Sequence, residues 1–194
     1  VVKIATGQPY SSLAALGIQY AEHFKENGVQ LELVTTAGAS ENLALLKQGK
    51  VDVAFSLGGM STGSDANIQS LGSVEYQPFW LFYRGPEFDG DNPSEFFSAK
   101  TFSVNIPGSG THHMVQQILP LHGINVEKND RLKQLSSNES VDALLSGKID
   151  GVFLTAGIES KTIQRILSDP SVRIFDFSVA EAYAKRLKFL EVIG

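Results

Sequence analysis

Glycines and hydroxyl-bearing residues gather in four short loops of the sequence, and these loops hold the groups best suited to binding a ligand. They span residues 6–12, 36–42, 56–60 and 107–112, and each follows a strand-like run. Where such a loop opens a helix, its backbone N–H groups favour an anion, typically a carboxylate or a phosphate. Each loop taken alone also looks like an ordinary strand-to-helix connection. Because all four fall in matched positions, they predict a site for a small anionic or zwitterionic solute.

The predicted ligand-binding residues come mostly from these loops, with one cation added. Arg84 ends the apolar run of residues 79–83, and a guanidinium can hold a carboxylate with two parallel hydrogen bonds. A surface pairing of Arg84 with Glu87 or Asp89 is the alternative interpretation. The full predicted set is Thr6, Gly7, Gln8, Tyr10, Ser40, Asn42, Ser56, Gly58, Arg84, Ser109, Gly110, Thr111 and Thr155.

Catalytic and metal-binding patterns find little support in the sequence. Ser109 lies in Gly-Ser-Gly-Thr, which is not the Gly-x-Ser-x-Gly turn of a serine nucleophile. His112 and His113 are adjacent on an expected helix and diverge by about 100°, so helix-surface histidines are the better interpretation. Asp52 and Asp150 occupy equal places at strand starts and are expected to be structural turn residues. The chain has no cysteine. We therefore predict no catalytic residue, no metal and no cofactor.

A repeated segment indicates the elements that must position these loops. Residues 40–55 and 139–153 share Leu-Leu, Gly-Lys, a β-branched residue, Asp and an apolar run that ends in Phe. With the leucine pairs aligned, the copies differ by one residue before the glycine. Each copy has the pattern of a short helix, a glycine stop and a buried strand. One such pair is common by chance, but a strand-like run and a small-residue turn precede both copies, which favours two similar α/β lobes.

The order of the elements predicts how the lobes are divided along the chain. Residues 1–82 are expected to form the first lobe and residues 83–157 the second, while residues 158–194 return toward the first lobe. Pro120 should bend or shorten the helix that stops at Gly123. Ligands of open α/β sheets sit at the carboxyl ends of the strands. Two such edges that face each other predict a cleft that closes on a hinge.

Composition narrows the possible classes of protein. The chain has 194 residues, with 16 Lys and Arg against 21 Asp and Glu, and no basic run, so nucleic-acid binding is not expected. No apolar run approaches the ~20 residues that span a bilayer. The sequence begins at Val1, already in a strand pattern, which indicates a processed segment whose targeting sequence is not visible.

Ordered motifs along nearly the whole chain resemble a known family. They include Ile4-Ala5-Thr6-Gly7 with Tyr10, Thr36-x-Gly38-x-Ser40-Glu41-Asn42-Leu43, Leu71-Gly72-Ser73-Val74, Phe82-Tyr83-Arg84, Gly108-Ser109-Gly110-Thr111, Gly147-x-Ile149-Asp150 and Ala182-Tyr183-Ala184-x-Arg186. The set is similar to the TAXI-type solute-binding proteins of TRAP transporters, within the NMT1-like group of periplasmic binding proteins. Two features depart from that family: Gln8-Pro9 stands where glycines are favoured, and the family continues beyond Gly194.

The resemblance implies a two-lobed type II periplasmic-binding-protein fold, in which each lobe is a mixed sheet flanked by helices and a hinge connects the lobes. It further implies capture of a small amino acid or organic acid, with glutamate-like or dicarboxylate solutes as a guess. The partner would be the membrane permease of a TRAP transporter, and the location periplasmic or extracytoplasmic. Some family members carry a C-terminal membrane anchor. The chain is then expected to be a piece of a longer protein whose first lobe is incomplete.

Two other classes of function are compatible with this fold. One is the ligand-sensing effector domain of a LysR-like regulator, which a DNA-binding helix-turn-helix upstream of Val1 would favour. The other is an enzyme such as a dehydratase, which needs a positioned acid or base in the cleft. The sequence shows no such group, so we rank the receptor first, the sensor second and the enzyme third.

Overall fold

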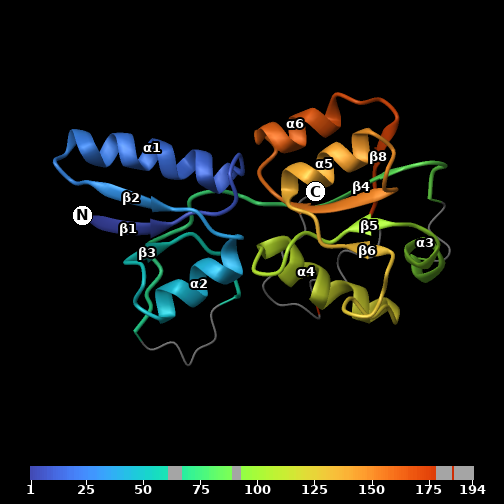
Figure 1. Ribbon diagram of the computed structural model, residues 1–194, viewed down its shortest axis with the longest axis horizontal. Helices are drawn as coiled ribbons and strands as arrows, with labels where there is room; N and C mark the ends of the chain where they lie inside the picture. Colours follow the sequence, from blue (N-terminus) through green and yellow to red (C-terminus); the bar gives the residue numbers. More distant parts are fainter. Residues whose placement is uncertain (61–66, 89–92, 178–184, 186–194) are drawn as a thin grey trace.

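Two α/β lobes lie side by side in the computed structural model, which describes residues 1–60, 67–88, 93–177 and 185 (Figure 1). The first lobe is a parallel sheet of order β2-β1-β3, with α1 and α2 on opposite faces (Figure 1). Its elements are β1 (Val2–Ala5), α1 (Ser12–Glu26), β2 (Leu31–Val34), α2 (Ala39–Lys47) and β3 (Val53–Ala54).

The second lobe is a five-stranded mixed sheet of order β6-β5-β7-β4-β8. In it β4 runs antiparallel to both of its neighbours, β7 and β8. Its elements are β4 (Phe79–Arg84), α3 (Pro93–Ala99), β5 (Phe102–Ser103), α4 (Gly110–Ile118), the 3-10 helix η1 (Leu119–His122), β6 (Leu132–Lys133), α5 (Ser137–Leu145), β7 (Gly151–Thr155), α6 (Lys161–Leu167) and β8 (Val172–Ile174). The predicted two-lobed α/β fold is therefore confirmed.

The chain enters the second lobe before β4, which is earlier than the predicted boundary. The predicted division at residue 82 falls inside β4, and all of β4 belongs to the second sheet. Leu81, Phe82 and Tyr83 are buried, so this strand needs cover on both faces and takes a central place between β7 and β8. The second lobe also retains α6, which packs on α5, and β8. The expected return toward the first lobe is thus not seen up to residue 177. Most of the chain beyond lies outside the described residues.

Alternation along β4 and β7 divides the core of the second lobe into two layers. Leu81, Tyr83 and Phe153 pack with the helices α3 and α4, while Phe82 and Val152 pack with α5 and α6. In Figure 1, α4 accordingly lies on one side of this sheet and α5 and α6 on the other. The larger part of the buried aromatic side chains is in the first of these layers, which therefore gives the second lobe a more extensive core than the three-stranded lobe.

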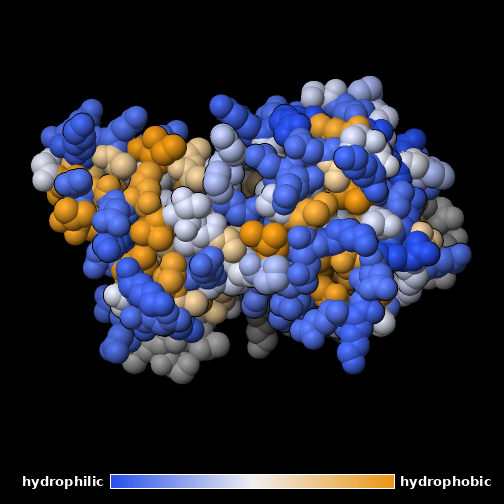
Figure 2. Space-filling model, in the orientation of Figure 1, coloured by the Kyte–Doolittle hydropathy of each residue, from blue (hydrophilic) through white to orange (hydrophobic). Residues whose placement is uncertain are grey.

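Apolar side chains remain exposed over the smaller first lobe. They include Val1, Ile18, Phe24 and Val29, which are 36–78% exposed. Figure 2 shows the corresponding apolar surface on that lobe. Within the described part of the chain, no helix has the length and apolar character needed to cross a membrane.

Many matched positions of the two lobes, though not those of β2 and β6, are separated by 98 positions in the sequence. Asp52 Oδ2 accepts the backbone N–H of Lys3 at 2.8 Å, and Asp150 Oδ2 accepts that of Thr101 at 2.8 Å. The backbone N–H of each aspartate bonds back to the carbonyl of the same partner. Each aspartate thus fastens the strand of its repeat to the neighbouring strand, which confirms the prediction that both are structural.

The same offset corrects the predicted alignment of the repeat. Gly49 N–H donates to Leu46 O at 3.0 Å, and Gly147 N–H donates to Leu144 O at 3.0 Å. Leu46 therefore corresponds to Leu144, and the expected one-residue gap is wrong. Both glycines have the left-handed conformation, with φ of 65° and 71°. This turn fixes where each helix ends, so the hydrogen bonds, and not the leucine pairs, define the correspondence.

A capping box begins α5. Ser136 Oγ accepts the N–H of Glu139, while Glu139 Oε2 accepts the Ser136 N–H at 2.9 Å and its hydroxyl at 2.6 Å. These bonds from Ser136 stabilise the carboxylate and lower the pKa of Glu139 below its ordinary value. A lowered folded-state pKa adds stability above the unfolded-state pKa, and this stability is lost as the pH falls through the folded-state pKa.

We expect Glu139→Gln to be less stable than the wild type at pH 7 and to lose that difference on acidification below the ordinary glutamate pKa of ~4.3. Urea unfolding at pH 7 and pH 3 measures this. Glu22→Gln is the control, because the exposed side chain of Glu22 on α1 makes no hydrogen bond or ion pair with any described residue. An equal difference between Glu139→Gln and the wild type at both pH values would contradict the prediction.

Candidate functional site

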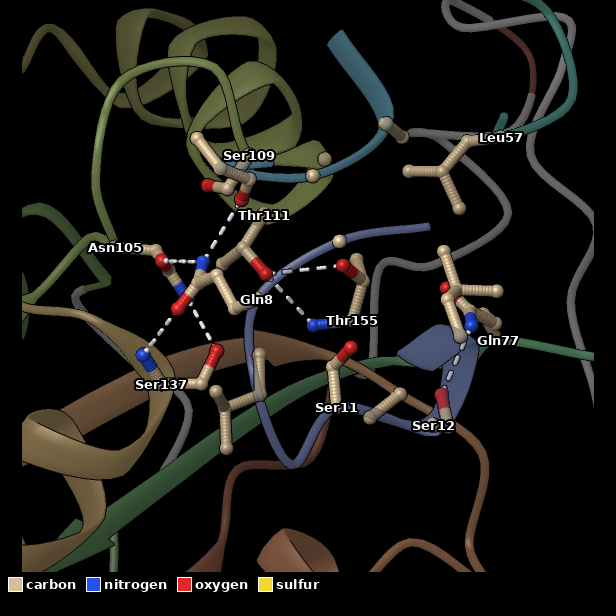
Figure 3. Close-up of a pocket in the computed structure, with 18 of the residues that line it drawn as sticks. Gln8, Ser11, Ser12, Leu57, Gln77, Asn105, Ser109, Thr111, Ser137 and Thr155 are labelled. Atoms are coloured by element: carbon tan, nitrogen blue, oxygen red, sulfur yellow. Dashed lines mark hydrogen bonds between the residues drawn. The ribbon is translucent and has the colours of Figure 1, made fainter. Parts of the chain in front are cut away.

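A small cavity lies between the lobes, where the starts of several helices meet (Figure 3). Its volume is about 50 Å³. That is comparable to roughly four water molecules. It is lined by Gly7, Gln8, Ser11, Ser12, Leu13, Ala37, Gly38, Ala39, Leu57, Gln77, Asn105, Ser109, Gly110, Thr111, Ser137, Leu154, Thr155, Ala156 and Thr162.

Part of the predicted set meets at this cavity. The members that line it are Gly7, Gln8, Ser109, Gly110, Thr111 and Thr155. Thr111 and Thr155 hold α4 against β7, since Thr111 Oγ1 accepts the Thr155 N–H at 2.9 Å and lies 2.9 Å from the Thr155 hydroxyl. Figure 3 shows both of these contacts between Thr111 and Thr155.

Gln8 connects the two lobes across the cavity. Its Nε2 donates to Ala37 O within the first lobe and to Asn105 Oδ1 in the second, each at 2.9 Å. Its Oε1 accepts the backbone N–H of Ser137, at the start of α5, at 2.8 Å. With only 8% of the residue exposed, this amide is a fixed part of the contact between the lobes. The departure from the family's glycines thus has a structural role.

Two residues of this network, Asn105 and Ser137, were missed by the sequence analysis. Asn105 has φ of 63°, is 1% exposed, and donates from Nδ2 to Ser137 Oγ at 3.0 Å. Asn at the end of a strand, just before Pro107-Gly108, was an available signal, because Asn tolerates this left-handed conformation. Ser136 with Glu139 likewise marked the start of a helix. Gln77 and Thr162 also line the cavity, and no sequence motif marks either residue.

The two loops that precede α1 and α4 have the same construction. Ser11 and Ser109, 98 positions apart, are the N-cap residues, and each accepts an N–H from three residues further on. Ser11 N–H donates to Gln8 O and Ser109 N–H donates to Ile106 O, both at 3.2 Å. Between these residues Tyr10 has φ of 65° where Gly108 has 88°. Both lobes therefore present a capped helix start to the cavity.

Other predicted residues lie away from the cavity. Thr6 and Asn42 are buried, and Asn42 Nδ2 donates to the carbonyls of Thr6 and Phe55 at 2.9 Å, which ties α2 to two strands. Ser40 is half-buried on α2 and does not line the cavity. The structure leaves Tyr10, Ser56 and Gly58 exposed.

The lobes are already in contact around the cavity. Glu41 N–H donates to Gly108 O across the boundary at 3.0 Å. A Cβ on Gly38 would lie 3.0 Å from Ser109 Cα, and a Cβ on Gly108 would lie 3.0 Å from Ala37 Cβ. Glycine permits the approach of Gly38 to the Ser109 backbone and of Gly108 to the Ala37 side chain. The described arrangement is therefore a closed one.

The model of one protein family covers almost all of this chain. The match is to the NMT1-like family and extends over residues 4–189. The chain belongs to the NMT1-like family. Among curated proteins, no sequence matches it.

Solved structures share the fold of this NMT1-like chain at low sequence identity. An ancestral arginine-binding protein bound to arginine has a TM-score of 0.57 at 18% identity, with 89% of this chain and 77% of that chain covered. A binding-protein component of a phosphonate ABC transporter from Pseudomonas aeruginosa has a TM-score of 0.59 at 14% identity. The match covers 89% of this chain and 63% of that chain. An ancestral amino-acid-binding protein, a precursor of cyclohexadienyl dehydratase, has 0.57 at 17% identity, covering 91% and 77%.

Arg84 lies at the far end of the second lobe, and the predicted ligand contact from it requires correction. Because β4 is antiparallel to β7, the end of β4 pairs with the start of β7, opposite the edge that faces the cavity. Arg84 Nε and Nη2 donate to the carbonyls of Leu144 and Leu145 at 2.6 and 3.0 Å. These carbonyls end α5, whose start lies at the cavity roughly 12 Å away at 1.5 Å per residue.

Among the described residues, Arg84 forms its ion pair with Asp169 and not with Glu87. Nη2 lies 2.7 Å from Asp169 Oδ2, and the two side chains are 26% and 28% exposed. Hydrogen bonds from Ser171 and, to a lesser degree, the Arg84 charge lower the pKa of Asp169. Glu87 pairs instead with Arg173 at 3.9 Å, and Asp89 lies outside the described residues.

We expect Arg84→Ala to lower the free energy of unfolding by about 2 kcal/mol, because it leaves the carbonyls of α5 and the Asp169 carboxylate without their charged donor. Solute affinity should not change. Urea unfolding and calorimetry measure the two effects. Arg173→Ala is the control on β8, since its more exposed ion pair contributes only about 0–1 kcal/mol. A loss of solute affinity without a loss of stability would instead support the role predicted from the sequence.

The two histidines of α4 differ in burial. His112 is 6% exposed, which corrects the expectation of a surface residue, and its Nδ1 lies 3.3 Å from Val104 O. His113 is half-buried, and burial lowers its pKa. The described ranges contain no group of three His, Asp or Glu side chains that could hold a metal ion together.

Proposed function

We propose that this NMT1-like chain is a solute-binding protein that captures a small anionic or zwitterionic solute between its lobes. The observation that carries the proposal is the cavity at the starts of α1, α2, α4 and α5. Helix starts supply N–H donors and a positive end of the helix dipole. Within the described residues that line the cavity, no acid, base or nucleophile pair is arranged for catalysis, so the arrangement supports binding.

The ligand contacts that we propose are the predicted residues at the cavity, together with the two that complete the network. These are Gly7, Gln8, Asn105, Ser109, Gly110, Thr111, Ser137 and Thr155. Closure of the lobes would bring donors from both of them onto one solute, as in hinge-closing proteins.

We also propose that the partner is the permease of a TRAP transporter and that the protein acts in the periplasm or another extracytoplasmic space. The support is the ordered motif set described above, within the family match over residues 4–189. Strains lacking this protein or its permease should show the same loss of uptake. Normal uptake in only one of the two strains would contradict the partnership.

A thermal-shift screen of amino acids and organic acids tests the binding proposal. Stabilisation by a ligand follows RT ln(1 + [L]/Kd), or about 2.7 kcal/mol at a hundred times Kd. The expected result is a rise in Tm that grows with the logarithm of the concentration of at least one solute. A flat response to all of them, with the complete protein, would overturn the proposed function.

A further inference from the structure

The cavity wall carries donors but no charge. None of the described residues that line it is Lys, Arg, His, Asp or Glu. Two carboxylates contact lining residues from outside: Glu41 Oε2 accepts the N–H of Ala37 at 2.6 Å, and Glu75 Oε2 accepts the amide of Gln77 at 3.0 Å. Neither carboxylate lines the cavity. A buried ammonium group needs a carboxylate or several free acceptors. The described residues of the wall include no carboxylate.

Four serine hydroxyls of the wall act as hydrogen-bond acceptors and leave their O–H groups unused as donors. The oxygens of four serines each accept a bond: Ser11 from Ala14 N, Ser12 from Gln77 Nε2, Ser109 from His112 N and Ser137 from Asn105 Nδ2. Among the described residues, none of these four hydroxyls donates to an acceptor. In contrast, the amide oxygens of Gln8 and Asn105 already accept bonds. A ligand rich in acceptors therefore suits this wall.

Thr162 provides an independent sign that a ligand completes the site. It lines the cavity, is 5% exposed, and its hydroxyl makes no hydrogen bond with any described residue. A buried polar group without a partner lowers the stability of the protein. A ligand oxygen within the cavity would satisfy this hydroxyl.

The starts of four helices add a positive electrostatic potential at the cavity. Four helices of at least nine residues begin at the cavity: α1, α2, α4 and α5. The positive ends of their dipoles favour a negative charge. The N-cap of α2 is Gly38, whose lack of a side chain leaves that helix start without a side-chain cap.

We infer that the solute is an oxyanion, a carboxylate or phosphonate, that carries no ammonium group beside its acidic group. This inference rests on the proposed function and narrows it, because zwitterionic amino acids are then poor ligands. The anion would be held by neutral donors alone, namely helix N–H groups and the hydroxyls of Ser109, Ser137 and Thr162.

Matched pairs of probes that differ by one ammonium group test the inference by calorimetry on the complete protein. The pairs are propionate with alanine and methylphosphonate with aminomethylphosphonate. We expect at least one anion to bind, and to bind at least tenfold more tightly than its ammonium-bearing counterpart. Counterparts that bind equally well or better would overturn the inference while the proposed function stands. No binding by these probes or by any solute of the screen would overturn both.

Thr162→Val tests the hydroxyl without changing the shape of the side chain. We expect this variant to bind the anion of the better pair five- to tenfold more weakly while its Tm stays equal to the wild type or rises. Ser168→Ala, at the end of α6 and away from the cavity, is the control and should bind as the wild type does. Unchanged affinity in Thr162→Val would overturn the assignment of this hydroxyl.

Discussion

Replacing Gly151 with valine should destabilise the protein by about 3 kcal/mol or more, at the upper end of the range for overpacking. A Cβ on Gly151 would lie 2.5 Å from a ring carbon of Phe102 and 2.9 Å from the carbonyl oxygen of Phe82. Phe102 is fully buried in the aromatic layer of the second lobe and cannot move aside without disturbing it. Urea unfolding measures the loss of stability.

The first lobe supplies the control for this substitution. There Ile4 pairs with Val53, at the positions that correspond to Phe102 and Gly151. Introducing Phe102→Ile into Gly151→Val should therefore restore part of the stability. The rescue stays incomplete, because the Phe82 carbonyl of β4 remains and β3 has no such neighbour among the described strands. If Gly151→Val unfolds at the same urea concentration as the wild type, the close packing described here is wrong.

A Gly38→Ala substitution should weaken solute binding about 100-fold, or roughly 3 kcal/mol. Gly38 has φ of 137° and ψ of −157°, a region open in practice only to glycine, where other residues cost ~1–3 kcal/mol. Its Cβ would also lie 3.0 Å from Ser109 Cα in the other lobe. The contact with Ser109 exists only in the closed arrangement, so its cost falls on solute binding. Calorimetry with a solute identified by the screen measures it.

Gly49→Ala separates the effect on closure from ordinary backbone strain. Gly49 also has a positive φ, 65°, but a Cβ there would meet nothing within 4 Å. This variant should lose about 1 kcal/mol of stability and keep its solute affinity. Equal losses of affinity in Gly38→Ala and Gly49→Ala would argue against a closure role for Gly38.

The local pattern of the sequence was enough to predict the fold class and most elements. The shortened helix before Gly123 is one example: α4 ends at Ile118, η1 contains Pro120, and Gly123 stops it with φ of 74°. The strand of residues 79–83 was also recognised from its continuous apolar run. These features depend on neighbours along the chain, which is why a single sequence contains them.

The misplaced residues depend on contacts between distant segments. Arg84 was assigned to the cleft because the sequences of β4 and β7 do not reveal that the two strands are antiparallel. Asn105 and Ser137 were missed because their role comes from Gln8, which reaches them from the other lobe. His112 was placed on the surface although its helix packs between the lobe contact and β7. Strand direction and lobe contacts are properties of the tertiary structure alone.

The matching construction of the two capped loops means that an enclosed solute would sit near an approximate dyad. From either side it would meet a serine N-cap preceded by a proline two positions earlier, Pro9 before Ser11 and Pro107 before Ser109. Such symmetry cannot by itself orient a molecule whose two ends differ. Orientation must come from the places where the halves depart from each other, above all Gly7 against Asn105 and Gln8 against Ile106.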